Sequence, residues 1–229
     1  MIVIFNIVIV YPDFFFSTSS NDHLEGSNSW PHWLPSLEYA DGYTRFKLST
    51  GLPLIGRLFR FLLGDPLCPT QHNSQVLNIG KPQPVIVFSH GMGAMRTTYS
   101  MLLTELASNG NFVAAVEHKD GSGSATVNVD GTWTYEKKIL PGEDEYEVRN
   151  RQVNQRVKEC ESAYKLLNQL VSDNKNDSDD EEAFQLHDPP SQQFLDSLRE
   201  AKLNLTEECY VSGHSFGGAT ALKSFYTSM

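Results

Sequence analysis

The residues best placed to do chemistry are a serine and two flanking glycines, in the run Gly213-His214-Ser215-Phe216-Gly217. This G-x-S-x-G spacing is that of a nucleophile elbow, a sharp strand-to-helix turn that exposes a serine hydroxyl. Residues without side chains at Gly213 and Gly217 let the neighbouring backbone pack that closely. Amides at the start of the following helix then face an oxyanion formed at the serine. The motif predicts Ser215 as an acyl-transfer nucleophile, with an ordinary glycine turn as the alternative.

A second glycine-containing turn follows an earlier apolar run. Residues 85–89 read Val-Ile-Val-Phe-Ser and lead directly into His90-Gly91-Met92-Gly93. An acyl-transfer serine needs two backbone amides aimed at the oxyanion, one of them from the residue after the nucleophile, here Phe216. The other comes from a loop after an earlier strand, and the run containing Gly91 and Gly93 stands where that loop is expected. By itself, this run also fits a plain strand-to-helix turn.

The segments around these turns alternate between strand and helix. Apolar runs predict parallel strands at 85–89, 112–117 and 208–212. Apolar positions at helical spacing predict helices at 52–63, 97–108, 143–171 and 191–201. Leu102 and Tyr146 are among the residues that this spacing turns toward the core. The order of elements predicts an α/β-hydrolase fold, with a mostly parallel sheet and helices on both faces.

Length and charge bound what the chain can be. Its 229 residues, 40% of them hydrophobic, suffice for one core, so we expect a single domain over residues 1–229. The formal net charge is −10, which disfavours a nucleic-acid partner, because a phosphate-binding surface needs a basic patch. Residues 172–190 carry seven acidic side chains against one lysine, and we expect a solvated, disordered loop there.

The cysteines and the first residues bear on cofactors and compartment. Cys68, Cys160 and Cys209 are too widely spaced for a disulfide framework or a zinc site, so we predict thiols. Apolar residues 1–10 predict a strand. A signal peptide is the alternative, disfavoured because neither Lys nor Arg precedes the run. We expect a cytoplasmic protein, with secretion as the alternative.

Three further segments each allow more than one interpretation. Residues 117–120, Glu-His-Lys-Asp, follow a predicted strand and either line the active cleft or form an exposed polar loop. Residues 121–124, Gly-Ser-Gly-Ser, lack most of a dinucleotide-binding fingerprint, so no dinucleotide is expected. Helix 52–63 either packs on the domain, which we favour, or presents an exposed face to lipid. Trp30 and Trp33 are expected to anchor the surrounding loop on the core.

Taken in chain order, several motifs resemble the platelet-activating factor acetylhydrolase family. They are Trp33-Leu34-Pro35 with Glu38-Tyr39, Phe88-Ser89-His90-Gly91-Met92-Gly93-Ala94, Val113-Ala114-Ala115-Val116-Glu117-His118-Lys119-Asp120, Arg149-Asn150-Arg151-Gln152-Val153-Asn154-Gln155-Arg156 and Gly213-His214-Ser215-Phe216-Gly217-Gly218-Ala219-Thr220. Because the resemblance runs through nearly the whole chain in one order, it is more specific than any single motif. The acidic segment 172–190 and the end at Met229 depart from it.

The resemblance implies a calcium-independent serine esterase without a cofactor. Its substrates would be phospholipids like platelet-activating factor, cleaved at the sn-2 acetyl or short acyl chain. By position, Ser215 would be the nucleophile, with the backbone amides of Met92 and Phe216 as the oxyanion hole. The implied partners are the phospholipid and, peripherally, a membrane or lipoprotein, and the oligomeric state is left open. A generic α/β-hydrolase carboxylesterase and a non-catalytic lipid-binding pseudoenzyme are the alternatives.

The triad of an α/β hydrolase follows the chain order nucleophile, acid, histidine. After Ser215 the sequence contains no Asp, Glu or His. We therefore expect the 229-residue chain alone to be close to inactive, with the C-terminal part of the fold missing and the strand before the elbow left as an exposed sheet edge. His90, His118 and His214 are the nearest substitutes for the base. None is expected to serve, since His90 belongs to the oxyanion loop and His214 should point away from the neighbouring hydroxyl.

Overall fold

The computed structural model describes residues 8–10, 32–48, 53–64, 66–68, 76–128, 131–172 and 192–227. Trp30, residues 1–7 and all but the first residue of the acidic segment 172–190 lie outside these ranges. Of the strand predicted at residues 1–10, the described part is β1 (Val8–Val10).

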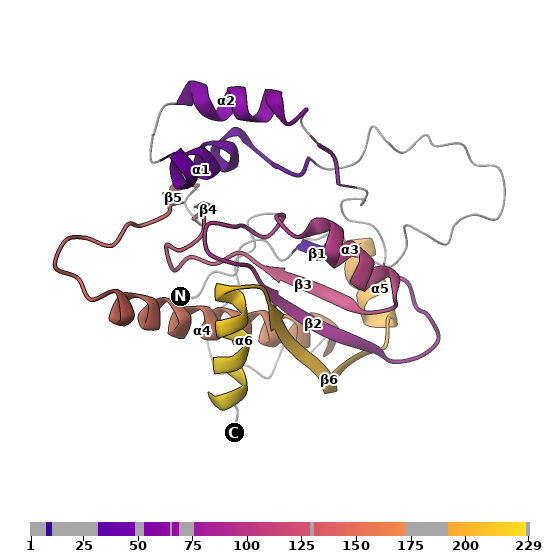
Figure 1. Cartoon of the computed structure of the whole chain (residues 1–229). Coiled ribbons are helices and arrows are strands. Elements are labelled where there is room, and N and C mark those ends of the chain that lie inside the picture. Colours follow the sequence, from indigo (N-terminus) through magenta and orange to yellow (C-terminus); the bar gives the residue numbers. More distant parts are fainter. Residues whose placement is uncertain are drawn as a thin grey trace.

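A four-stranded sheet forms the centre of the described chain, in the order β1-β3-β2-β6 (Figure 1). Its principal strands are β2 (Gln83–Ser89), β3 (Phe112–Val116) and β6 (Leu203–Gly213). Strand β2 runs parallel to both β3 and β6, whereas β1 pairs antiparallel with β3. The three predicted parallel strands are therefore confirmed, and β6 has one neighbouring strand among the described residues, as expected for a sheet edge.

The register of the parallel strands brings their carboxyl ends together. Ser89 at the end of β2 lies beside Val116 of β3 on one side and beside Gly213 of β6 on the other. Loops that follow parallel strands emerge at this same edge of a sheet, which is where α/β folds place their ligands. The backbone pairing therefore sets residues 90–93 next to the turn that contains Ser215.

Helices cover both faces of the sheet, as predicted. On one face, α3 (Ser100–Ser108) packs Leu103 and Ala107 against Phe88, Val113 and Ala115. The other face is covered by α4 (Glu145–Ser172), α5 (Gln192–Glu200) and α6 (Phe216–Thr227). The core on that side contains Val85, Phe112, Ala114, Leu167, Phe194 and Leu198. The alternation of Val85 and Val87 with Ile86 and Phe88 places successive β2 side chains on opposite faces.

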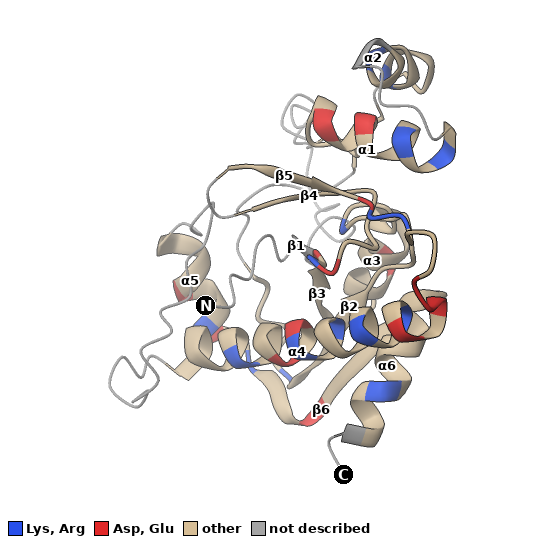
Figure 2. Cartoon of the chain, turned by 90° about the vertical axis from the view of Figure 1, so that its left-hand side faces the viewer, with Lys and Arg blue, Asp and Glu red and all other residues tan. Residues whose placement is uncertain are grey.

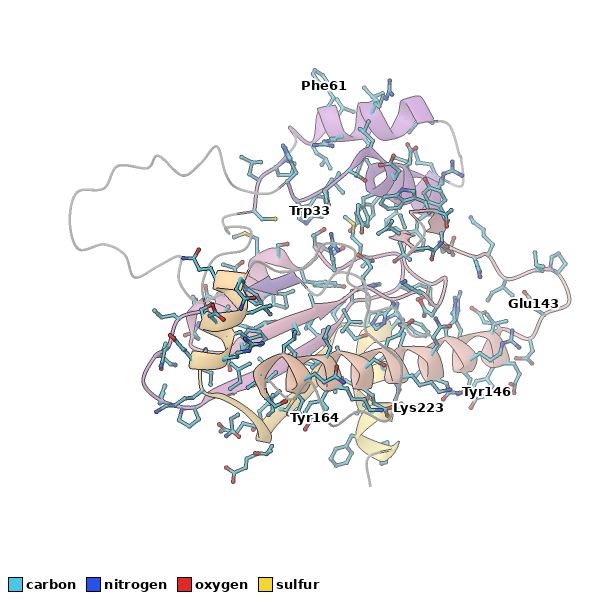
Figure 3. All side chains as sticks on the ribbon, turned by 180° about the vertical axis from the view of Figure 1, so that it is seen from behind. Trp33, Phe61, Glu143, Tyr146, Tyr164 and Lys223 are labelled. Atoms are coloured by element: carbon cyan, nitrogen blue, oxygen red, sulfur yellow. The ribbon has the colours of Figure 1, made fainter. Side chains whose placement is uncertain are left out.

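The prediction that Tyr146 and Leu102 face the core is wrong. Tyr146 is 73% exposed because it lies in the first turn of α4, which extends past the sheet, and its ring points away from the body of the molecule (Figure 3). Leu102 is 48% exposed, since α3 begins at Ser100 after a turn and so faces the sheet with Leu103 instead. The apolar spacing marked the stripe of each helix but not which of its members reach the core.

The N-terminal region adds a layer that the sequence did not predict. Helix α1 (Leu37–Leu48) packs on a hairpin of β4 (Ala125–Val127) and β5 (Trp133–Tyr135). Outside it lies α2 (Pro53–Leu62), whose helical assignment is confirmed (Figure 1). Trp33 stacks on Tyr43 of α1 with ring centroids 5.7 Å apart, so its predicted anchoring role is confirmed.

Charged residues are spread over the helices and are sparse on the sheet (Figure 2). In α1 the acidic Glu38 stands in the first turn, and Arg45 and Lys47 stand in the last, which matches the helix dipole. No helix among the described residues is both long enough and apolar enough to cross a bilayer.

We predict that Leu167→Ala destabilises the fold by about 2–5 kcal/mol, because the Leu167 side chain is wholly buried and its truncation leaves a cavity between α4 and the sheet. Tyr146→Ala on the same helix should change the free energy of unfolding by less than about 0.5 kcal/mol. Urea unfolding followed by circular dichroism measures both. Equal losses for the two variants would contradict this placement of α4.

Candidate active site

Ser215 occupies a strained turn between the end of β6 and the start of α6. Its φ is 56°, and it is the one non-glycine among the described residues with a positive φ. The turn is closed by Gly217 N–H donating to the His214 carbonyl at 2.9 Å and by Gly218 N–H donating to the Ser215 carbonyl at 2.9 Å. The Ser215 residue is exposed. A left-handed non-glycine residue costs about 1–3 kcal/mol, and such strain concentrates at functional sites.

Gly213 and Gly217 are required by contact between backbones. A Cβ placed on Gly217 would fall on the Ser89 carbonyl oxygen and lie 2.9 Å from the His90 carbonyl oxygen. A Cβ on Gly213 would lie 2.6 Å from the same Ser89 oxygen and 2.5 Å from the Gly217 oxygen. The two glycines therefore let the elbow settle directly on the end of β2, as the sequence predicted.

The loop after β2 lies against the elbow. A Cβ on Gly91 would be 3.5 Å from the Ser215 Cβ, so the loop and the serine face each other. Gly93 has a φ of 67°, and its N–H donates to the Ser122 carbonyl at 2.8 Å. Neither the Met92 amide nor the Phe216 amide donates a hydrogen bond to any of the described residues. The structure thus brings the residues predicted from the two glycine runs to one place.

The hydroxyl of Tyr99 links the loop to the elbow. It accepts a hydrogen bond from Gly91 N–H at 3.3 Å and lies 2.9 Å from Nδ1 of His214. The Tyr99 and His214 rings are 5.5 Å apart between centroids. The Nδ1 atom of His214 is therefore engaged by Tyr99.

Residues 117–120 neither line an open cleft nor form an exposed loop, so both interpretations of this segment need correction. Glu117, His118 and Asp120 are 3%, 1% and 7% exposed. They form a buried polar layer behind the loop at residues 90–93, where α4 and the hairpin close over the end of β3. A run of consecutive polar residues carries no periodicity, so the burial of this segment could not be predicted from its residues.

One chain of hydrogen bonds in this layer joins serine, histidine and glutamate. Ser89 Oγ is 2.7 Å from His118 Nε2, and His118 Nδ1 is 2.6 Å from a Glu159 carboxylate oxygen. Burial lowers the pKa of His118 well below its usual value, and the nearby Arg156 charge lowers it further. Burial raises the pKa of Glu159 to about 7. Although this is the connectivity of a catalytic triad, Ser89 is 0% exposed and cannot meet a substrate.

Glu117 is a buried carboxyl group with few compensating contacts. Tyr39 Oη donates to it at 3.2 Å, the Arg96 amide donates at 3.5 Å, and His90 Nε2 stands 3.9 Å away. Burial raises the pKa of Glu117 to about 7, and the Arg96 guanidinium, with its Nε 3.9 Å away, acts in the opposite direction. Burial also lowers the pKa of His90 well below its usual value.

A model of the family described as platelet-activating factor acetylhydrolase, isoform II, matches residues 11–229. The chain belongs to this family. It is 36% identical over 214 residues to a platelet-activating factor acetylhydrolase of Canis lupus familiaris, covering 87% of this chain and 44% of the relative. The corresponding protein of Gallus gallus is 36% identical over 210 residues, covering 84% and 46%.

A more distant relative is a putative phospholipase A2 of Schizosaccharomyces pombe, 30% identical over 154 residues, covering 60% of this chain and 33% of the relative. Among solved structures, a ferulic acid esterase from Streptomyces cinnamoneus aligns with 87% of this chain and 46% of its own, at 21% identity and a TM-score of 0.44. The chain spans less than half the length of the acetylhydrolases it matches.

The polar layer is the part of the site that sequence reasoning missed. Arg156 is 0% exposed and hydrogen-bonds Asp120 and Ser122, a role that neither the apolar stripe of its helix nor the motif containing it predicted. The burial of Arg156 could have been inferred from its position in the helix. The face of α4 that carries the apolar stripe contains Gln152, Val153, Arg156 and Val157. None of the described residues form a group of three or more His, Cys, Asp or Glu that could hold a metal ion.

We predict that Gly217→Ala lowers the free energy of unfolding by at least about 3 kcal/mol, because the atoms that the new Cβ meets are backbone atoms of Ser89 and His90 and cannot move aside cheaply. Gly218→Ala is the matched control. Its Cβ would meet the Gly213 oxygen at 3.6 Å, an ordinary contact, so stability should stay unchanged or rise by up to about 1 kcal/mol. Urea titration compares the two, and equal stability would overturn the packing described for the elbow.

We also predict a pH-dependent contribution from Glu117. The pKa of Glu117 is about 7 in the folded protein and has its ordinary, lower value in the unfolded chain. At a pH between these two pKa values the folded protein binds a proton that the unfolded chain has lost, so the free energy of unfolding falls as the pH rises through this range. Relative to Glu117→Gln, the wild type should lose about 2–3 kcal/mol between pH 5 and pH 8. Glu161→Gln, at an exposed position of α4, should leave the wild-type profile unchanged. Parallel wild-type and Glu117→Gln profiles would show that this carboxyl does not titrate as described.

Proposed function

We propose that this protein is a serine esterase that hydrolyses the sn-2 acetyl or short acyl chain of phospholipids resembling platelet-activating factor, without calcium. The observation that carries the proposal is Ser215 at a positive φ on an elbow, packed against the loop that contains Gly91. The acetylhydrolase names of the relatives give the substrate class.

In this proposal Ser215 Oγ attacks the ester carbonyl and forms a tetrahedral intermediate. The Met92 and Phe216 amides donate to its oxyanion, for which both are free of other partners among the described residues. Collapse of the intermediate breaks the ester C–O bond and leaves an acetyl group on Ser215, while the proton lost by Ser215 Oγ passes to the departing oxygen, so that the lyso-lipid leaves as its alcohol. Water then attacks this acyl-enzyme and releases acetate.

A second candidate function, lipid binding with little or no turnover, is favoured by the positions of the histidines. His90 donates through Nδ1 to the Gly91 carbonyl. His118 is hydrogen-bonded to Ser89 and Glu159. Nδ1 of His214 is hydrogen-bonded to the Tyr99 hydroxyl. Thus none of these three imidazoles is placed as a base for Ser215. A serine hydroxyl without a positioned base is a weak nucleophile at neutral pH. We therefore propose that the 229-residue polypeptide retains only the residual activity of an enzyme that lacks a triad member. Such an enzyme hydrolyses its ester about 10³–10⁴-fold faster than water alone does.

Ser215→Ala should abolish hydrolysis of an acetyl-phospholipid and labelling by a fluorophosphonate, while the unfolding midpoint stays unchanged because the Ser215 side chain is exposed. The variant is made both in the 229-residue polypeptide and in the longest polypeptide that the gene encodes. A p-nitrophenyl ester measured in parallel distinguishes a general carboxylesterase from a phospholipid enzyme, and EDTA tests independence from calcium. Full labelling of the Ala variant would place the nucleophile elsewhere. High turnover by the 229-residue polypeptide would refute the missing base.

We further propose that α2 makes peripheral contact with the lipid surface. Leu58, Phe61 and Leu62 are 54%, 79% and 73% exposed on its outer side, and the Phe61 ring points away from the molecule (Figure 3). Arg57 and Arg60 stand among them, so apolar and cationic groups share one helix. The side that faces α1 is tightly packed, since a Cβ on Gly56 would fall on Asp41. A cytoplasmic location is proposed as well, in keeping with three free thiols, and cell fractionation distinguishes it from secretion.

Phe61→Ser together with Leu62→Ser should weaken binding to phosphatidylcholine vesicles by about tenfold or more in a sedimentation assay, because two apolar side chains lose their burial in the bilayer surface. Met101→Ser with Leu102→Ser on α3 removes exposed apolar groups from another face and should bind as the wild type does. Equal losses for the two pairs would show that binding is not localised to α2.

A further inference from the structure

Arg156, in the middle of α4, is the largest fully buried side chain among the described residues. Its guanidinium is held by Asp120, which accepts from Nε at 2.8 Å, and by Ser122 Oγ, which lies 2.6 Å from Nη2. Ser122 Oγ is itself bonded to the Asp120 carboxylate. A buried charge of this kind survives only when it is paired and hydrogen-bonded, and here both conditions are met.

The remaining contacts of Arg156 lead to both turns of the candidate active site. Nη1 donates to the His90 carbonyl at 2.5 Å, one residue before Gly91. The guanidinium carbon lies over the Phe216 ring, 4.8 Å from its centroid. One side chain from α4, a helix that contains neither turn, therefore touches the loop and the elbow together.

An indirect contact fixes the far end of the loop. The main-chain carbonyl of Ser122 accepts the hydrogen bond from Gly93 N–H at 2.8 Å, while the Ser122 hydroxyl is bonded to Arg156. His90 and Gly93, on either side of Gly91 and Met92, are thus both tied to the same guanidinium cluster. The direction of the Met92 amide follows from the positions of these two residues.

We propose that Arg156 is a positioning residue that holds the two oxyanion donors, the amides of Met92 and Phe216, at a fixed separation. The inference rests on the function proposed above, and it adds a role for a residue that a substrate cannot reach, because its side chain is fully buried. The guanidinium bonds the Met92 side through the carbonyl of His90 and packs on the Phe216 side through the ring. Displacement of either turn would move one donor relative to the other.

The requirement is for arginine and not merely for a positive charge. Three nitrogens of one planar group reach Asp120, Ser122 and the His90 carbonyl, while the carbon between them lies over the Phe216 ring. A lysine ammonium at this position could balance the charge of Asp120, but it has no planar face and cannot reach all of these acceptors at once.

The test is Arg156→Lys, which keeps the charge, with Arg151→Lys as the control, because Arg151 is on the same helix with a side chain 68% exposed. In the longest polypeptide that the gene encodes, Arg156→Lys should lower kcat for an acetyl-phospholipid by about 10–100-fold and change KM by less than about twofold. The loss should be smaller than the 10²–10³ caused by removing a donor outright. Arg151→Lys should match the wild type in both constants.

Hydrogen exchange measured by mass spectrometry supplies a second readout that needs no activity. In Arg156→Lys, the peptides covering residues 89–95 and 213–219 should exchange at least about tenfold faster, while the peptide covering 112–116 exchanges as in the wild type. Phe216→Leu leaves the ion pair between Arg156 and Asp120 intact, and it replaces Arg156→Lys as the test variant if Arg156→Lys does not fold. It should accelerate exchange at 213–219 and leave 89–95 unchanged.

Unchanged exchange at 89–95 and 213–219 in Arg156→Lys would overturn the proposal, and so would equal acceleration at 112–116, which would show general destabilisation. A wild-type kcat in Arg156→Lys would also overturn it. If the wild type turns over no ester, the proposed function fails, and the exchange experiment alone decides whether Arg156 holds the two turns together.

Discussion

The close approach of two backbone turns is the constraint on which the rest of the site depends. Strands β2 and β6 are paired so that Ser89 lies beside Gly213, and the elbow then folds back onto the carbonyl groups of Ser89 and His90. No side chain can be accommodated at Gly217, because the atoms it would meet belong to the backbone of a central strand. Exposure of Ser215 at a positive φ is the consequence, since the chain must reverse sharply within that space.

Behind these turns the protein buries charge where an apolar core would be simpler. Arg156 and Asp120 are both wholly buried in their side chains, and Glu117 and His118 lie in the same layer. A protein in which hydrophobic residues replace a buried ion pair is often as stable as the original protein, so stability alone does not account for this arrangement. What the polar groups provide is direction. Carbonyl oxygens and amides of the loop at residues 90–93 can be fixed by hydrogen bonds, which have preferred geometry, whereas apolar contacts have none.

The sequence predicted the parts of the fold that repeat a pattern and missed the parts that do not. Runs such as Val85-Ile86-Val87-Phe88 and the stripe of α4 identify the parallel strands and the long helix, because burial on a sheet imposes their spacing. The hairpin of β4 and β5 was missed, since each strand has three residues, too few for a period to show. Helix α1 was also missed: its sequence mixes Gly, Asp and Thr with few strong apolar residues, and it forms by packing Tyr39 and Ala40 on that hairpin.

The residues of the candidate site also fall into those that the sequence predicted and those that it did not. Ser215 and the glycines could be found because backbone constraints restrict the residue type at each position to one or two choices. The partners of Arg156 could not, because Asp120 and His90 are 36 and 66 residues away in sequence and nothing local marks them as its neighbours. Burial of a polar residue depends on what the rest of the chain places over it, and a single sequence does not contain that information in readable form.

The N-terminal layer is joined to the site by contacts that differ in kind from those of the core. Phe46 of α1 packs on Gly93, Tyr39 of the same helix bonds Glu117, and Tyr43 bonds Thr98 in the turn before α3. Helix α1 therefore lies between the loop at residues 90–93 on one side and α2, with its exposed Phe61, on the other (Figures 1 and 3). Because α1 contacts Gly93, Glu117 and Thr98 from three different positions along its length, the orientation of α2 relative to Ser215 is set by the fold. A surface that receives α2 would consequently meet the protein with the elbow in one fixed orientation.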